Sequence, residues 1–177
     1  LAQCGRALAL QPGLGEAHYV ISMVRLYRQE FDLAWEQYEQ RLEAKEYRRK
    51  SFRERAATLQ IYERLPHWRG PGEAGVREVA IWAEQGIGDE LVFSTLVPEL
   101  IGSGVPVSYE VDRRLLGAYQ RAFPAVRFVA REEPPRAELQ EASRVLLIGS
   151  LPGLFRRTRE AFARQPAKLL GALPERV

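Results

Sequence analysis

Apolar side chains recur every three or four residues through the first third of the chain, from Leu1 to about Lys50. This spacing is typical of amphipathic helices that pack against one another. Helix-breaking residues are few in this stretch apart from the segment QPGLG at positions 11–15. The pattern continues through an arginine-rich segment as far as Arg64. Because glutamates are mixed among those arginines, we interpret the segment as a solvated helix face. We therefore expect two to four helices in this region.

A break in the helical pattern marks the expected domain boundary. Pro66, Pro71 and several glycines interrupt the pattern, and they flank Trp68, a bulky side chain that is unusual in a linker. We expect Trp68 to hold the linker against a neighbouring domain. The predicted organisation is a helical region at 1–65, a linker at 66–75 and an α/β domain at 76–177.

Beyond the linker, short apolar runs alternate with segments of helical periodicity. Strands separated by such helices predict a parallel sheet of the Rossmann type, so the expected fold class is α/β. Pro98 falls inside the first predicted helix and should kink it or end a turn there. The predicted strands are 78–84, 105–111, 125–130 and 144–150. The predicted helices are 89–104 and 113–123, with a short helix within 132–142 and a partly helical segment at 152–166.

Composition and charge narrow the functional classes. The hydrophobic fraction of 46% and the charged fraction of 28% are ordinary for a globular chain of 177 residues. The net charge is +3 and basic residues are mixed with acidic ones, so we expect no nucleic-acid partner. No apolar run approaches the ~20 residues of a membrane span. Cys4 is the single cysteine, and His18 and His67 lack ligand spacing. No disulfide, metal or cofactor is therefore expected, and the predicted location is cytoplasmic.

A glycine loop follows the first predicted strand, in the stretch EQGIGD at 84–89. Ligands of parallel α/β sheets bind beside the carboxyl ends of the strands, which is where this loop begins. Gly86 and Gly88 can adopt positive φ and let another group approach the backbone. Asp89 is placed to cap the following helix, whose first N–H groups favour an anion. The loop lacks the third glycine of a dinucleotide-binding fingerprint. Two interpretations stay open: the loop is a phosphate-binding or catalytic corner, or it is only a tight turn with a helix cap.

The helical region resembles a tetratricopeptide repeat across ALALQPGLGEAHYVISMVRLYRQEFDLAWEQYEQRL, residues 7–42. Arg25 and Arg41 depart from the repeat, because an aromatic residue and an alanine are usual at those positions. The resemblance implies either a scaffold or a surface for a peptide partner, and we favour the scaffold. The matching positions are Ala7 and Pro12 at the end of one repeat, Ala17, His18, Ile21 and Ser22 in the next helix, and Phe31, Ala34 and Tyr38 in the helix after it.

A second resemblance spans most of the chain. The residues that carry it are Pro66, Trp68 and Gly70, then Glu84 to Asp89, then Pro98, and finally GSLPGLF at 149–155. The pattern resembles bacterial proteins in which tetratricopeptide repeats precede a glycosyltransferase region. That region is similar to heptosyltransferases and, more distantly, to protein O-GlcNAc transferases. Such enzymes have two Rossmann-like halves, an arrangement called GT-B. The resemblance implies that this chain is a fragment with the repeats and the N-terminal, acceptor-side half.

The same resemblance implies roles for the glycine loop. Asp89 matches the proposed general base of heptosyltransferase-like enzymes, which takes a proton from the acceptor hydroxyl. Gln85, Gly86 and Gly88 would then contact the substrate. The implied partners are a nucleotide-sugar donor, bound mainly by the other half, and a protein or saccharide acceptor. This chain alone is expected to be inactive and to bind nucleotide-sugars very weakly.

Departures from the glycosyltransferase pattern keep other functions open. Glu90 and Leu91 replace small or β-branched residues, and Ser94 and Thr95 stand where many relatives have an aromatic residue and Arg. These changes imply a different acceptor or a degenerate domain. The main alternative is a non-catalytic tetratricopeptide interaction module. A further alternative is a phosphate or nucleotide binder of another class, and enzymatic activity is left open.

Overall fold

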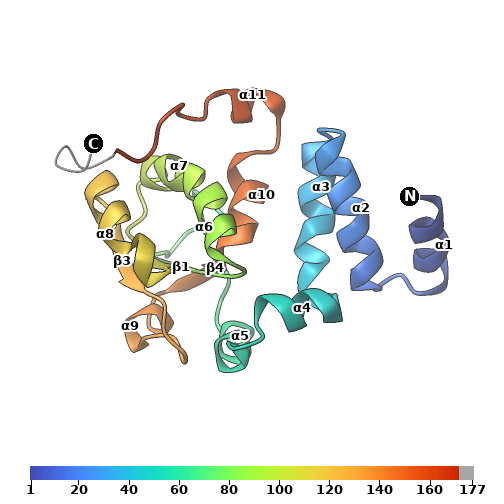
Figure 1. Ribbon diagram of the computed structural model, residues 1–177, viewed down its shortest axis with the longest axis horizontal. Coiled ribbons are helices and arrows are strands. Elements are labelled where there is room, and N and C mark those ends of the chain that lie inside the picture. Colours follow the sequence, from blue (N-terminus) through green and yellow to red (C-terminus); the bar gives the residue numbers. More distant parts are fainter. Residues whose placement is uncertain (172–177) are drawn as a thin grey trace.

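The computed structural model describes residues 1–171. Helices from the first third of the chain lie beside a body built on a small sheet (Figure 1). There are more of these helices than the two to four expected, because extended or irregular backbone at Ala44 and Arg55 interrupts the periodic pattern. They are α1 (Ala2–Leu10), α2 (Gly15–Tyr27), α3 (Phe31–Tyr38), the 3₁₀ helix η1 (Glu39–Glu43), α4 (Lys45–Ser51) and α5 (Ala56–Tyr62).

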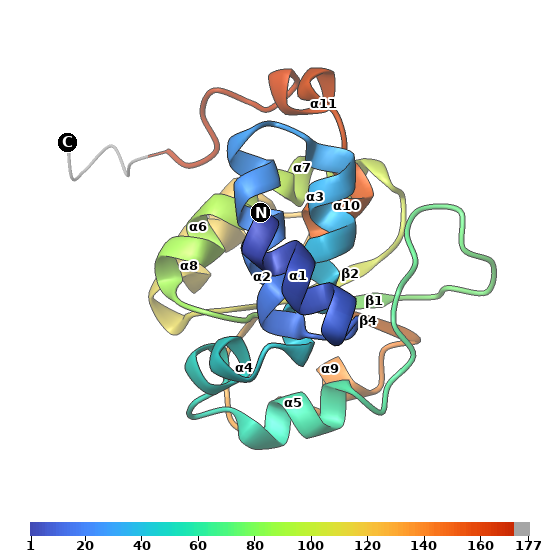
Figure 2. The same ribbon diagram turned by 90° about the vertical axis from the view of Figure 1, so that its right-hand side faces the viewer.

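Helices α2 and α3 pack side by side, and α1 lies on the outer side of α2 (Figure 2). Ala17 and Ala34 are buried in this helical region, Ala34 completely. Gly15 marks the tightest approach, because a Cβ at this position would lie 2.3 Å from the carbonyl carbon of Glu43. Any side chain at Gly15 would therefore separate the start of α2 from the end of η1.

The body of the protein contains a four-stranded, all-parallel sheet in the order β3-β2-β1-β4. This arrangement confirms the prediction of a parallel α/β fold. The observed strands are shorter than predicted, and residues 148–150, expected to end the last strand, form the 3₁₀ helix η3. Each strand is buried along almost its whole length, which explains its continuous apolar sequence. The strands are β1 (Val79–Trp82), β2 (Val107–Val111), β3 (Arg127–Ala130) and β4 (Arg144–Leu147).

The sequence predicted one helix at 89–104 after β1, but the structure has two. The first helix begins earlier, at Ile87, and a 3₁₀ segment separates it from the second. Pro98 lies in the first turn of the second helix, a position that tolerates proline. The segment predicted as partly helical at 152–166 also forms two short helices. The helices of the body are α6 (Ile87–Phe93), η2 (Ser94–Leu96), α7 (Val97–Gly102), α8 (Arg113–Ala122), α9 (Ala137–Gln140), η3 (Ile148–Ser150), α10 (Leu151–Phe155) and α11 (Arg159–Ala163).

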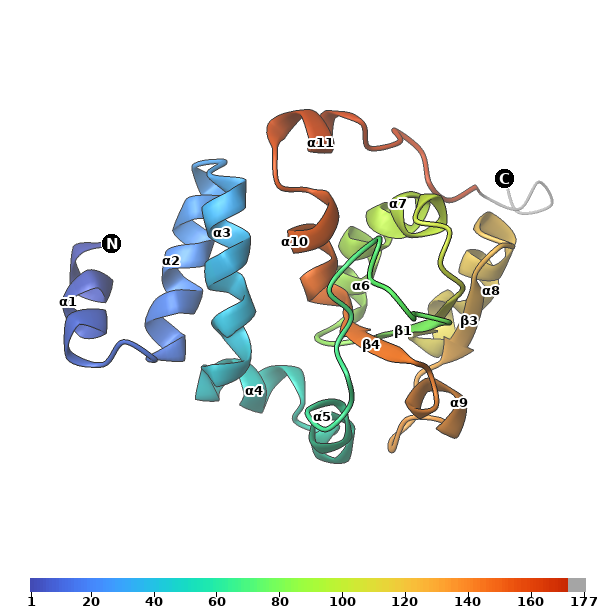
Figure 3. The ribbon, with the colours of Figure 1, turned by 180° about the vertical axis from the view of Figure 1, so that it is seen from behind.

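Two hydrophobic clusters cover the two faces of the sheet. Figure 3 shows α7 and α10 on one side of the strands and α5 and α9 on the other. On one face, Ile81 and Tyr109 pack with residues of α7, α8 and α10. On the other face, Trp82 and Leu147 pack with α9 and with residues of α4 and α5. The first third of the chain thus supplies part of the layer that covers the sheet. The last residues of the predicted α/β domain, 172–177, lie outside the described part.

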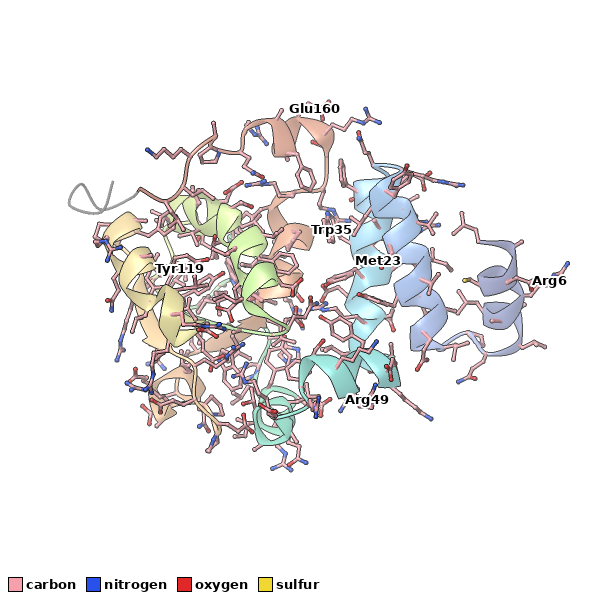
Figure 4. The ribbon with its side chains drawn as sticks, in the orientation of Figure 1. Arg6, Met23, Trp35, Arg49, Tyr119 and Glu160 are labelled. Atoms are coloured by element: carbon pink, nitrogen blue, oxygen red, sulfur yellow. The ribbon has the colours of Figure 1, made fainter. Side chains whose placement is uncertain are left out.

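Trp68 lies where the two parts of the chain meet, as expected. Its side chain is 3% exposed and packs near Phe155 of α10. The backbone N–H of Trp68 donates to the carbonyl of Val145 at 2.9 Å, which attaches the linker to the edge strand β4. Trp68 also lines a cavity of about 190 Å³ together with Trp35 of α3. Trp35 is labelled in Figure 4, and its indole N–H donates to the carbonyl of Arg156 at 2.9 Å.

Candidate functional site

A cavity of about 650 Å³ opens between the helical region and the glycine loop. We call it the helix–loop groove. It lies at the exit of β1, the strand end at which parallel α/β sheets bind ligands. A second cavity of about 390 Å³ shares Lys50, Ser51 and Gln85 with it and continues toward Arg131, after β3. The helix–loop groove is lined by Glu16, Tyr19, Val20, Ala44, Glu46, Tyr47, Lys50, Ser51, Gln85 and Gly86.

The glycine loop has a different backbone from the one expected. Positive φ occurs at Gln85, with φ 62°, whereas Gly86 is extended with φ −100° and ψ 174°. Gly88 lies inside α6 and is not among the residues that line the groove. A residue in extended conformation is the usual N-cap of a helix, so Gly86 takes that position.

Asp89 is therefore not the N-cap, which corrects the sequence-based expectation. It occupies the first turn of α6, three residues after Gly86, and its Oδ2 accepts the backbone N–H of Gly86 at 3.2 Å. This bond is the acidic half of a capping box, and Gly86 has no side chain to supply the other half. Burial and the nearby charge of Asp89 raise the pKa of Tyr19, which lines the groove. Asp89 is not itself among the lining residues, but its hydrogen bond to Gly86, which lines the groove, places it next to the groove, and it is partly exposed.

The Gln85 side chain connects Asp89 with two tyrosines of the helical region. Its amide contacts the hydroxyls of Tyr38, at 3.2 Å, and of Tyr47 on one side, and the Asp89 carboxylate on the other. An amide oxygen facing the tyrosines accepts their O–H groups, and the amide nitrogen then lies 2.9 Å from Asp89 Oδ1. The opposite orientation would direct the amide oxygen at a carboxylate, so the first orientation is the favourable one.

A buried ion pair lies behind the loop. The guanidinium of Arg41 donates to Glu84 through Nη2 at 2.9 Å and through Nε at 3.3 Å, and both side chains are completely buried. Arg41 also donates to Ser150 Oγ at 2.8 Å, and the Gly149 N–H donates to Glu84 at 2.7 Å. A Cβ at Gly149 would overlap the Glu84 carboxylate. These contacts join η1, the exit of β1 and the exit of β4.

Sequence reasoning missed the role of this pair. The sequence marks Arg41 only as a departure from the resemblance to a repeat, and Glu84 only as part of a motif. A signal was available: an arginine that a packed helix buries needs a buried carboxylate as its partner. Glu84 directly follows an apolar strand, which makes it a candidate partner.

A second set of ion pairs holds the ends of β2 and β3. Arg55 donates to both oxygens of Glu110 at 2.8 and 2.7 Å, and the Ala83 N–H donates to the same carboxylate at 3.0 Å. Burial raises the pKa of Glu110, although Arg55 opposes that shift. Arg131 lies 3.0 Å from the carboxylates of both Glu90 and Asp112.

Asp89 differs from these paired carboxylates. Within residues 1–171 no Lys or Arg lies within 4.0 Å of its carboxylate, and its partners are an amide and a backbone N–H. The charged residues around the loop therefore fix the scaffold, while Asp89 keeps a carboxylate that a cation does not neutralise.

The histidines take part in local packing. His18 Nδ1 lies 2.5 Å from Gln37 Oε1, and its Nε2 lies 2.7 Å from the carbonyl oxygen of Pro12. His67 Nε2 lies 3.1 Å from the carbonyl oxygen of Tyr62. In the described part of the chain, no group of three or more His, Cys, Asp or Glu side chains could hold a metal ion. None of the helices in that part has the length and apolar character needed to cross a membrane.

Comparisons with known proteins add little. No protein-family model matches the chain, and no solved structure matches it. Among curated proteins, a segment of 66 residues is 36% identical to Protein FlbA from Caulobacter vibrioides. The match covers 36% of this chain and 11% of the length of FlbA. So short a match shows no family, and the function has to be argued from the site.

The buried tyrosines beside the groove predict a loss of stability at alkaline pH. Burial, with a smaller contribution from the charge of Glu84, raises the pKa of Tyr38 from 10.0 to about 12. Below pH 10 this phenol is protonated in both the folded and unfolded states. Between pH 10 and 12 only the unfolded chain ionises, so its contribution to stability falls, by about 1.4 kcal/mol at pH 11.

We expect Tyr38→Phe to make the decline in the free energy of unfolding between pH 9 and 11 shallower by about that amount. Urea denaturation at a series of pH values measures it. Tyr27→Phe is the matched control, because Tyr27 is 90% exposed. Equal slopes for wild type and Tyr38→Phe would contradict the prediction.

Proposed function

We propose that the chain is the acceptor-side half of a glycosyltransferase-like protein of GT-B type, preceded by tetratricopeptide-like helices. The protein would transfer a sugar from a nucleotide-sugar donor to a hydroxyl group of a protein or saccharide. The observation that carries the proposal is the helix–loop groove, a cavity at the exit of a parallel strand with Asp89 next to it. A cavity of this size fits the 300–1,000 Å³ range of ordinary ligand sites.

The proposed chemistry uses the Asp89 carboxylate as the general base. It would accept the proton of the acceptor hydroxyl while that oxygen forms a bond to the anomeric carbon of the donor, and the nucleotide would leave with the bonding electrons. The base has to be free of a neutralising cation for this step, and the contacts of Asp89 within residues 1–171 meet that requirement. Gln85 and Gly86 line the groove on the loop side.

The lining of the groove supports an acceptor with both apolar and hydroxyl surfaces. Tyr19 and Tyr47 contribute aromatic rings to the lining, which suit sugars and peptides, although the Tyr47 hydroxyl is already bonded to Gln85. Glu46 and Lys50 add charges at 3.2 Å from each other. In this proposal the donor nucleotide is held by a second Rossmann-like half, and the chain by itself neither transfers sugar nor binds nucleotide-sugars tightly.

A non-catalytic interaction module is the second candidate. Two observations favour it. The Asp89 carboxylate already has a structural role in accepting the Gly86 N–H. Helix α2 also exposes apolar side chains that a peptide could cover, namely Val20, Met23 and Tyr27.

A pair of glycine substitutions tests whether the groove binds the acceptor. A Cβ at Gly86 would have only an ordinary contact, 3.8 Å from Asp89 Oδ2, and a Cβ at Gly88 would meet nothing within 4 Å. Both positions therefore accept a side chain. We expect Gly86→Trp in the full-length protein to raise the KM for the acceptor about tenfold, or 1.4 kcal/mol.

The assay measures nucleotide release from UDP-, GDP- and ADP-sugars with peptide and oligosaccharide acceptors. Gly88→Trp is the matched control, because Gly88 lies only two residues further along the chain, in the first turn of α6, but does not line the groove. We expect its KM to stay near that of the wild type. Equal effects of the two substitutions would exclude the groove as the acceptor site.

A further inference from the structure

Gln85 adopts a backbone conformation that its residue type disfavours. Its φ is 62°, in the left-handed region, which is sterically unfavourable for a residue with a Cβ. Glycine would avoid this cost, and glycine is the very next residue. Strained residues of this kind cluster at functional sites when the surrounding structure holds them in place. The positive φ therefore indicates that the Gln85 side chain has a role that glycine could not fill.

The surroundings hold the Gln85 backbone from both sides. Its carbonyl accepts Arg131 Nη1 at 3.3 Å, and Arg131 is itself fixed by Asp112 and Glu90. On the other side, Glu84 is locked to Arg41 by the buried ion pair. The loop thus cannot relax easily, and Gln85 presents its side chain in a set direction.

The side-chain amide of Gln85 connects the helical region to Asp89 through hydrogen bonds. Tyr38 comes from α3 and Tyr47 from α4, and each hydroxyl has one proton to donate. With the amide oxygen toward these hydroxyls, the amide nitrogen lies 2.9 Å from Asp89 Oδ1 and 3.3 Å from Oδ2. Burial raises the pKa of both phenols, so both remain protonated donors at neutral pH.

We infer that Gln85 is a positioning residue: Tyr38 and Tyr47 fix the orientation of its amide, and the amide orients the carboxylate of Asp89. The inference rests on the proposed function and deepens it, because it assigns the tetratricopeptide-like helices a part in setting the proposed base. Gln85, expected from the sequence to contact substrate, then acts mainly through Asp89. The carboxylate receives two donors, the amide of Gln85 and the N–H of Gly86, which together restrict its rotation.

The chain contains a matched control for the backbone strain. Gln29 is also a glutamine with positive φ, 60°, in the turn between α2 and α3, and its side chain is exposed. Gln29→Gly and Gln85→Gly both relieve the strain. Only Gln85→Gly removes contacts to Asp89.

Kinetics in the full-length protein test the positioning role. We expect Gln85→Gly to lower kcat about 10–100-fold, the range for a misplaced catalytic group, with less change in the KM for the acceptor. The double variant Tyr38→Phe/Tyr47→Phe should lower kcat in the same way, and Gln29→Gly should leave it unchanged. In an Asp89→Asn background, Gln85→Gly should cause no further loss, because the two residues act as one unit. An equal loss in both backgrounds would overturn the inference.

A spectroscopic measurement separates this inference from the proposed function. Nitrogen-15 NMR of the same protein resolves side-chain amide groups. The Gln85 amide resonances should move in Asp89→Asn and in Tyr38→Phe/Tyr47→Phe, while those of Gln29 stay in place. If the Gln85 resonances move but Asp89→Asn keeps normal turnover, the hydrogen bonds of Gln85 are confirmed and the proposed role of Asp89 as the general base is contradicted. If the Gln85 resonances do not respond to either change, the positioning inference is wrong whatever the turnover.

Discussion

Arg41→Ala is expected to lower the free energy of unfolding by about 3–5 kcal/mol, the cost of leaving one member of a buried ion pair without its partner. Glu84 would keep the N–H of Gly149 as a donor but lose both guanidinium bonds, and the single proton of the nearby Tyr47 hydroxyl is donated to Gln85. Water cannot replace them easily, because the Glu84 side chain has no exposed surface. Urea denaturation followed by circular dichroism measures the change.

Two further variants show whether the loss comes from the buried charge. Arg49→Ala removes an exposed arginine whose pair with Glu46 is also short, 2.7 Å, and we expect no measurable change in the urea midpoint. Arg41→Met combined with Glu84→Gln removes both charges and should be more stable than Arg41→Ala. If Arg41→Ala unfolds at the same urea concentration as Arg49→Ala, the pair does not hold the helical region to the sheet.

Asp89→Asn is expected to lower turnover of the full-length protein by about 10²–10⁴-fold, because an amide cannot take the acceptor proton. The fold should tolerate the change. Asparagine can still accept the Gly86 N–H, and the loss of a negative charge from the first turn of α6 costs no more than about 1 kcal/mol. Turnover has to be measured beside the melting temperature of each form.

Glu46→Gln is the control for this experiment, since Glu46 is a carboxylate that lines the groove away from the glycine loop. We expect it to change turnover far less than Asp89→Asn. Near-normal turnover in Asp89→Asn would leave Asp89 with only its helix-terminal hydrogen bond. The non-catalytic interaction module would then be the better description of the chain.

Local patterns predicted the sheet well because the strands are buried on both faces. The run VAIW of β1 has no exposed residue, and such continuous apolar runs between helices indicate a parallel sheet. The same patterns placed helix ends less well. Asp89 has the residue type of an N-cap, but the chain reaches extended backbone at Gly86, so the helix begins earlier.

Local sequence patterns could not predict the contacts that hold the candidate site. Arg41 and Glu84 are 43 residues apart, and Gln85 and Tyr38 are 47 apart. A sequence shows that a charge follows an apolar strand, but not which helix brings the opposite charge. The positive φ of Gln85 could not be predicted either, because glutamine rarely adopts it.

The positions of the four strands along the chain, the parallel sheet and the place of the glycine loop at the exit of β1 follow from the sequence alone, because hydrophobic periodicity and glycine or proline breaks act over a few residues. The three-dimensional structure was needed to place α4 and α5 on one face of the sheet and Arg41 beside Glu84. It also decided that Gln85 links two tyrosines to Asp89. These features depend on which distant segments become neighbours, and that is set by packing of the whole chain.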